Sequence, residues 1–106
     1  MGKRTALSAG LQRFLDQVDG DFPVSRMILF GSRARGKARR FSDVDLIVVS
    51  PRFRRLSSIE RGARMYDYWD LDYPADFLCY TPEEFDRLKA RPTLVREAVE
   101  HGVALR

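Results

Sequence analysis

The stretch that decides the fold is MILFGSRARGKARRFSDVDLIVV, residues 27–49. Its first residues are apolar and predict a strand that ends at Gly31-Ser32. Its last residues, VDLIVV, are rich in β-branched side chains and predict a second, buried strand. The arginine-rich segment between them is expected to be a short helix or a turn, because Gly36 weakens a helix there. A glycine turn after one strand, with carboxylates opening the next, indicates a site for phosphate and metal.

Residues 31–38 also resemble a P-loop, in which G-x-x-x-x-G-K-[ST] cradles phosphates with backbone N–H groups. Gly31, Gly36 and Lys37 fit that spacing, but Ala38 stands where the magnesium-binding hydroxyl belongs. A methyl group cannot ligate magnesium, which requires oxygen ligands. The alternative interpretation takes only Gly31-Ser32 as the phosphate-binding turn and assigns metal binding to the carboxylates that follow.

Three aspartates are the candidate metal ligands. Asp43 and Asp45 stand two residues apart at the start of the strand 44–49, so both side chains are expected on one face. Asp76 opens a third expected strand, ADFLCY, and an adjacent strand could carry it level with the pair. Each aspartate alone would be an ordinary strand-end residue. Together they would repel one another unless a cation lies between them, which favours a metal site.

The rest of the chain alternates helices with strands. Apolar spacing predicts helices over residues 4–19, 57–69, 81–89 and 93–102. The third helix has a firm start in the capping box Thr81-Pro82-Glu83-Glu84. The apolar face of the second is expected to hold Ile59, Gly62, Ala63, Tyr66 and Trp69. Strands are expected over 24–30, 44–49 and 75–80. The expected fold is α/β (α+β), a small mixed sheet with helices packed on one face, in a single domain spanning residues 1–106.

Composition limits the class of protein. Apolar residues make up 44% and charged residues 32%, which is ordinary for a globular chain. No apolar run approaches the roughly 20 residues of a membrane span, and the first ten residues lack the apolar core of a signal peptide. The single cysteine, Cys79, cannot form an internal disulfide, which agrees with a reducing compartment. We therefore expect a cytoplasmic protein.

The basic residues are concentrated in one part of the chain. Residues 33–64 hold ten of the nineteen Lys and Arg but three of the fifteen Asp and Glu. A basic segment around a glycine turn suits a polyanionic ligand, and arginine can grip phosphate with two parallel hydrogen bonds. Nucleic acid is a further candidate ligand, although charge alone does not establish it. The only histidine, His101, is interpreted as a helix-end cation and not as a catalytic group.

The sequence GSRARGKARRFSDVDL, residues 31–46, resembles the signature of the minimal nucleotidyltransferases, the small members of the DNA polymerase beta-like nucleotidyltransferase superfamily. In that signature Gly-Ser is followed by ten residues and then Asp-x-Asp, as Gly31-Ser32 and Asp43-Val44-Asp45 are here. The segment ADFLCYTPEEF is similar to the family's third-carboxylate strand and its next helix. The resemblance covers most of residues 27–88 and implies the nucleotidyltransferase fold.

The resemblance also implies a mechanism. Asp43 and Asp45 would bridge two Mg²⁺ ions, and Asp76 would ligate the ion that activates the acceptor hydroxyl or act as its base. The substrate would be a nucleoside triphosphate such as ATP, which loses pyrophosphate. Gly31 and Ser32 would hold its β and γ phosphates at a helix N-terminus. The best candidates to neutralise the triphosphate are Arg33 and Arg35.

For function, the resemblance implies transfer of AMP to a hydroxyl, in particular that of a tyrosine, on a partner protein. Such chains pair with helical HEPN-domain proteins, often RNA-cleaving toxins, and act as MntA-type antitoxins. One alternative is a binding module that neutralises the partner by occlusion. Another is a small-molecule nucleotidyltransferase of the aminoglycoside-modifying type. The five intact residues of the motif favour the enzyme, because a pure binder has no need of a costly carboxylate cluster.

Overall fold

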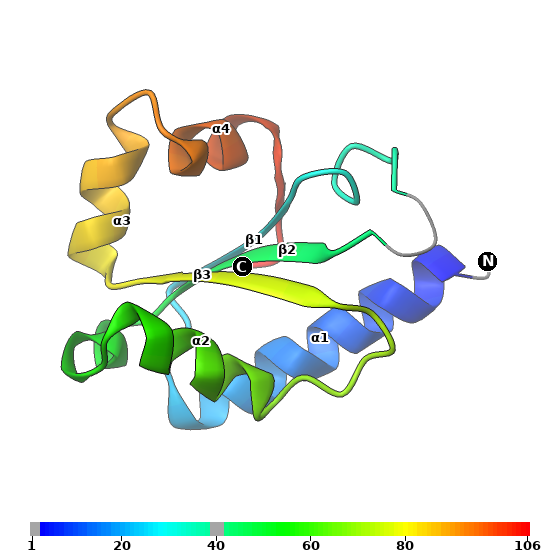
Figure 1. Cartoon of the computed structure of the whole chain (residues 1–106), viewed down its shortest axis with the longest axis horizontal. Helices are drawn as coiled ribbons and strands as arrows, with labels where there is room; N and C mark the ends of the chain where they lie inside the picture. Colours follow the sequence, from blue (N-terminus) through cyan, green and yellow to red (C-terminus); the bar gives the residue numbers. More distant parts are fainter. Residues whose placement is uncertain (1–2, 39–41) are drawn as a thin grey trace.

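A computed structural model of the chain describes residues 3–38 and 42–106 (Figure 1). In chain order the elements are α1 (Lys3–Asp21), β1 (Arg26–Phe30), β2 (Val44–Val49), the 3₁₀ helix η1 (Pro51–Arg55), α2 (Ser58–Tyr66), β3 (Ala75–Tyr80), α3 (Pro82–Lys89), α4 (Leu94–His101) and β4 (Val103–Ala104). The strands β2 and β3 have the predicted bounds. The elements η1 and β4 were not expected from the sequence.

The four strands form one mixed sheet in the order β3-β2-β1-β4. Strand β1 pairs antiparallel with both β2 and β4, whereas β2 and β3 are parallel. The expected small mixed sheet is therefore confirmed. In the parallel pair the register sets Asp45 beside Asp76, and in the antiparallel pair it sets Phe30 beside Asp45. The end of β1 and the beginnings of β2 and β3 thus share one edge of the sheet.

Helices cover both faces of this sheet, whereas the sequence had predicted helices on one face (Figure 1). One face packs against α1, η1 and α2, whose buried side chains include Phe14, Phe53 and Met65. The other face packs against α3 and α4 through Phe85, Val95 and Ala98. The reason lies in β2, where alternate residues point to opposite faces and almost all are apolar and buried. Both faces therefore need cover.

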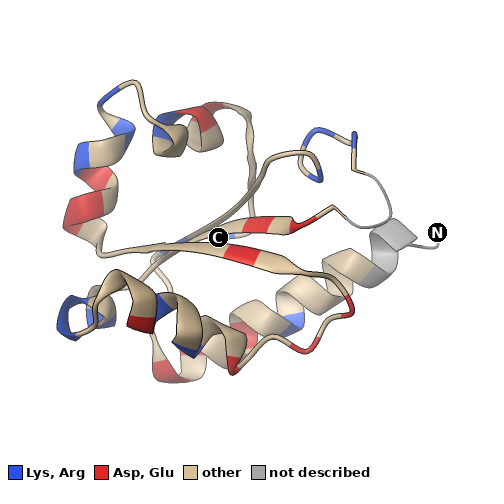
Figure 2. Ribbon diagram, in the orientation of Figure 1, with Lys and Arg blue, Asp and Glu red and all other residues tan. Residues whose placement is uncertain are grey.

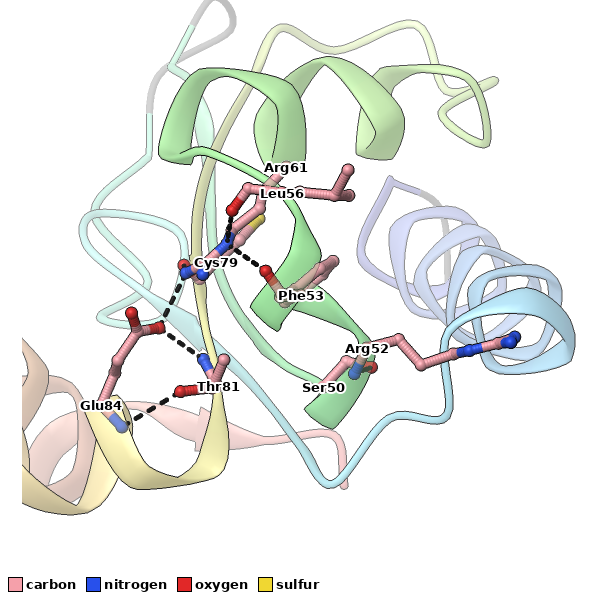
Figure 3. Close-up of polar contacts among 8 residues, drawn as sticks. All are labelled: Ser50, Arg52, Phe53, Leu56, Arg61, Cys79, Thr81 and Glu84. Atoms are coloured by element: carbon pink, nitrogen blue, oxygen red, sulfur yellow. Dashed lines mark hydrogen bonds and ion pairs between the residues drawn. The ribbon is translucent and has the colours of Figure 1, made fainter.

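Helix α2 presents a different face to the core from the one predicted. Ile59 is 86% exposed and Tyr66 is also exposed, whereas Arg61 and Met65 are buried. The burial of Arg61 is tolerated because its Nε and Nη1 atoms each donate hydrogen bonds to two acceptors (Figure 3). Arg61 Nε donates to the carbonyls of Phe53 and Leu56, at 2.9 and 3.0 Å.

The same guanidinium connects α2 with β3 and α3. Arg61 Nη1 donates to the Cys79 carbonyl at 3.2 Å and to Glu84 Oε1 at 2.7 Å. Glu84 Oε1 also accepts the Thr81 N–H, and Thr81 Oγ1 accepts the Glu84 N–H, which is the predicted capping box. Helix α2 therefore faces the core with Arg61 and Met65, and not with the apolar residues that helical periodicity predicted.

In the part of the chain that the structure describes, no helix is both long enough and apolar enough to cross a bilayer.

Candidate active site

The three aspartates singled out in the sequence share the sheet edge formed by β1, β2 and β3. Asp45 lies within β2, Asp43 two residues before it, and Asp76 directly beside it on β3. Figure 2 shows acidic residues, in red, on the neighbouring strands β2 and β3. Residues in register on adjacent strands point to the same face, so Asp45 and Asp76 both project on the α3 and α4 side of the sheet. Asp43 and Asp76 are exposed and Asp45 is half-buried.

The carboxylates act on one another electrostatically. Burial raises the pKa of Asp45 above its usual value, and the negative charges of Asp76 and Asp43 raise that pKa further. Because the three carboxylates repel one another, their ionisation lowers the stability of the fold unless a cation is bound between them. The register of the strands therefore concentrates negative charge where the sequence predicted a metal site.

Gly31 brings the end of β1 into contact with this charge. Its φ is +76°, in the left-handed region that favours glycine. A Cβ at this position would lie 2.3 Å from Asp45 Oδ2, closer than any real contact allows. Glycine is thus favoured by its backbone conformation, and a side chain here would in addition displace the Asp45 carboxylate. The predicted phosphate-binding turn and the carboxylates consequently form one site.

Residues 31–36 form a turn and not a helix. The Arg35 N–H donates to the Gly31 carbonyl at 3.2 Å, and the Lys37 N–H donates to the Ser32 carbonyl at 2.9 Å. Gly36 then takes a φ of +71°, which breaks any helical continuation. Phosphate binding at a helix N-terminus is therefore not available here, and backbone N–H groups of the turn are the candidate donors instead. Residues 39–41 of this segment lie outside the described residues.

The two arginines that the sequence left as equal candidates have different surroundings. Arg33 donates through Nε and Nη2 to the Ser42 carbonyl, at 3.1 and 2.8 Å, and lies 4.5 Å from the centre of the Tyr73 ring. These contacts tie the turn to the segments that precede β2 and β3. Arg35 is exposed and lines a pocket beside Gly31. Arg33 is thus placed to hold the loop, and Arg35 to meet a ligand.

This pocket, which we call the α4 pocket, has a volume of ≈ 200 Å³. It is lined by Phe30, Gly31, Arg35, Leu94, Glu97, Ala98, His101 and Gly102. The sequence had assigned His101 only a capping role, and it singled out neither Leu94 nor Glu97. No sequence motif near these residues indicates a functional role, because they reach the site only through the packing of α4 against β1.

The donor set of the site suits magnesium, which takes carboxylate oxygens together with phosphate oxygens and water. Among residues 3–38 and 42–106, no three or more His, Cys, Asp or Glu side chains converge closely enough to hold a metal ion. Asp43 and Asp76 are exposed, so their side chains are free of core packing and can change rotamer. The three aspartates suit the ion by the type of their oxygen ligands, and holding it would require their carboxylates to come closer together than they lie here.

The described cations of the segment 33–64 lie in separate parts of the molecule (Figure 2). Its first cations lie in the turn at the carboxylate edge. A second group, Arg52, Arg54, Arg55 and Arg64, lines a groove of ≈ 790 Å³ beside η1 and α2. Strand β2 runs from the carboxylates to η1, so the two groups lie at opposite ends of the sheet. Arg61 belongs to neither, because it is buried.

Comparison with known proteins gives a consistent result. The family described as "Nucleotidyltransferase domain" matches residues 11–105. A crystal structure of a candidate nucleotidyltransferase from Sulfolobus solfataricus superposes with a TM-score of 0.64, over 82% of this chain and 84% of the other. The two sequences are 23% identical, so this similarity establishes the fold alone. No curated protein matches the sequence at a significant level.

Proposed function

Because the chain belongs to the nucleotidyltransferase domain family, we propose that it transfers AMP from ATP to a hydroxyl group of a partner protein. The observation that carries the proposal is the position of Asp45, which lies between Gly31 on one side and Asp76 on the other. A phosphate-binding turn and a carboxylate pair on the same edge are what transfer at an α-phosphate requires.

In the proposed reaction each residue has a separate task. Backbone N–H groups after Gly31, the Ser32 hydroxyl and the Arg35 guanidinium bind the β and γ phosphates. Asp76 accepts the proton of the acceptor hydroxyl. The hydroxyl oxygen then forms a bond to the α-phosphorus, the bond from that phosphorus to the bridging oxygen of the β phosphate breaks, and pyrophosphate leaves.

Asp43, Asp45 and Asp76 are the residues proposed to hold Mg²⁺. Two bound ions would neutralise the phosphate oxygens and the charge that develops during an in-line displacement. Burial raises the pKa of Asp45, and the negative charges of Asp76 and Asp43 raise that pKa further; this repulsion supports the assignment, because a bound cation would relieve it.

We assign the acceptor to a partner protein because the large groove beside η1 and α2 lies at the opposite end of the sheet from Asp76 and cannot hold an acceptor there. Positioning of the reacting groups can account for roughly 7–11 kcal/mol of a reaction barrier, so an enzyme without an acceptor site is slow. The partner proposed is a HEPN-domain protein with an RNA-cleaving activity, modified on a tyrosine. The chain would then act as its antitoxin.

The test is transfer of label from α-³²P ATP to a co-expressed HEPN partner. We expect labelling by the parent chain, loss of labelling with Asp43→Asn and with Asp76→Asn, and normal labelling with Asp72→Asn. Asp72 is a matched control, an exposed aspartate outside the carboxylate cluster.

Two outcomes would contradict the proposal. If the Asp43→Asn chain still neutralises the partner fully and the parent leaves that partner unlabelled, the chain is a binding module. If the isolated chain labels small alcohols or aminoglycosides efficiently, the acceptor is a small molecule.

A further inference from the structure

The α4 pocket lies beside the carboxylates, and the proposed reaction uses only its Gly31 and Arg35 end. Its walls are mostly apolar, formed by Phe30, Leu94, Ala98 and the glycines 31 and 102. Three polar side chains complete it, from Arg35, Glu97 and His101. A small apolar cavity with a few polar groups is the usual form of a site for a flat organic ligand.

The floor of the pocket is fixed by core packing. Phe30 and Ala98 are buried members of the cluster between α4 and the sheet. A Cβ on Gly102 would lie 2.4 Å from the Ala98 carbonyl and 2.8 Å from the Leu29 carbonyl, so only glycine lets α4 close this tightly on β1. The pocket is therefore preformed, and ordering it on binding costs little conformational entropy.

Its rim is apolar and accessible. Leu94, at the start of α4, is 52% exposed although it lines the cavity. A ligand that covered this side chain would gain hydrophobic free energy in proportion to the area removed from water. Phosphate groups would gain nothing there, since burying a charge against carbon is unfavourable.

The order of the strands places the pocket on the donor side of the site. In the order β3-β2-β1-β4, Asp76 lies on one side of Asp45 and Gly31 on the other. The α4 pocket begins at Gly31 and Arg35, which the proposed reaction assigns to the triphosphate. The acceptor hydroxyl meets Asp76, across β2 from the pocket. The pocket therefore suits the nucleotide and not the acceptor.

We infer that the α4 pocket binds the nucleobase of the donor nucleotide, an inference that rests on the proposed function. The ring lies over Phe30 and Ala98 with Leu94 at its edge, and Glu97 accepts a hydrogen bond from an exocyclic amino group. A carboxylate acceptor selects bases that carry such an amino group, as adenine does, over uracil, which does not. A site built to hydrogen-bond a group discriminates against ligands that lack it.

Calorimetric titration of the parent chain with ATP, UTP and inorganic tripolyphosphate, each with magnesium, tests the inference. We expect ATP to bind more tightly than either of the others. Leu94→Ala should weaken ATP roughly tenfold, as expected for loss of one leucine contact, and should leave tripolyphosphate unchanged. Glu97→Gln should reduce the preference for ATP over UTP. The matched controls are Val99→Ala, an exposed apolar residue of α4 outside the pocket, and Asp86→Asn, an exposed carboxylate of α3.

Failures of the two proposals look different. If the parent binds neither ATP nor tripolyphosphate, the proposed function fails and the pocket assignment fails with it. If the parent binds both but Leu94→Ala and Glu97→Gln bind ATP as the parent does, the pocket assignment alone is wrong. Equal weakening of ATP and tripolyphosphate by Leu94→Ala would also overturn it, because that would show an effect on the phosphates.

Discussion

Gly31 and Asp45 approach so closely that a methyl group on the glycine would overlap the carboxylate, at 2.3 Å from Oδ2. This contact joins the turn after β1 to the carboxylates of β2, two segments that pair antiparallel up to Phe30 and Asp45. The geometry at the proposed α-phosphate site therefore depends on a residue without a side chain.

Gly31→Ala is expected to destabilise the fold and abolish ATP binding. The left-handed backbone conformation costs a residue with a Cβ roughly 1–2 kcal/mol, and the overlap with Asp45 adds to this. Thermal melts and titration with ATP measure the two effects. Gly62→Ala is the control, since a Cβ there meets nothing within 4 Å and alanine favours the helix α2. An alanine variant at 31 that melts and binds as the parent does would show that the turn tolerates a side chain.

Asp45→Asn is expected to abolish magnesium-dependent ATP binding and, in EDTA at neutral pH, to leave the melting temperature unchanged or raise it. The pKa of Asp45 in the folded state lies above the usual 3.8. Ionisation of Asp45 therefore lowers the stability of the fold when the pH is above this folded-state pKa. As the pH falls through the raised pKa, the parent should regain this stability and the variant should lose its advantage.

Melts in EDTA from neutral pH down to about 3.8 follow that difference. A variant that melts far below the parent at neutral pH without metal would show that Asp45 is a structural residue, and the site assignment would be wrong.

Arg33→Ala is expected to affect stability, whereas Arg35→Ala is expected to affect ATP binding. Arg33 makes two hydrogen bonds to the Ser42 carbonyl and packs on Tyr73, so its loss should lower the free energy of unfolding by about 1–2 kcal/mol. Arg35 lines the α4 pocket and is exposed, so its loss should weaken ATP binding and leave stability nearly unchanged. Urea unfolding and ATP titration of both variants separate the roles. Equal losses of ATP affinity with no loss of stability would show that both bind phosphate.

Arg61→Ala is expected to destabilise the protein by about 3 kcal/mol, because it removes the guanidinium that donates to the carbonyls of Phe53 and Cys79 and that pairs with the Glu84 carboxylate. Arg54→Ala is the matched control. Arg54 pairs with Glu83 on the surface, where water screens the pair, and its loss should cost well under about 1 kcal/mol. Urea unfolding of the two variants gives the comparison, and similar values would show that the Arg61 network contributes no more than a surface pair.

The same network predicts a pH dependence. Burial acts to raise the pKa of Glu84, but hydrogen bonds from the Thr81 N–H and the Arg61 guanidinium outweigh it, and the pKa lies below the usual 4.5. The contribution of ionised Glu84 to the free energy of unfolding is therefore complete above pH 4.5. It is lost as the pH falls through the folded-state pKa of Glu84. Arg61→Ala should reduce this acid sensitivity, which melts between neutral and acidic pH would measure.

The sequence by itself determined the local features of this protein. The strands 44–49 and 75–80 follow from runs of apolar and β-branched residues, and the start of α3 follows from its capping box. The spacing from Gly31-Ser32 to Asp43 and Asp45 indicated a nucleotidyltransferase, and the match over residues 11–105 confirms the nucleotidyltransferase domain family. Each of these signals depends on residues close together in the chain, where period, capping and glycine conformation act directly.

Only the tertiary structure decided which distant residues meet. The parallel register sets Asp76 beside Asp45, and the return of α4 over β1 brings Leu94, Glu97 and His101 to the site. It also buries Arg61 instead of Ile59. Register and helix docking are set by the total apolar area that the packed sheet removes from water, and that quantity belongs to the assembled core and to no single segment of the chain.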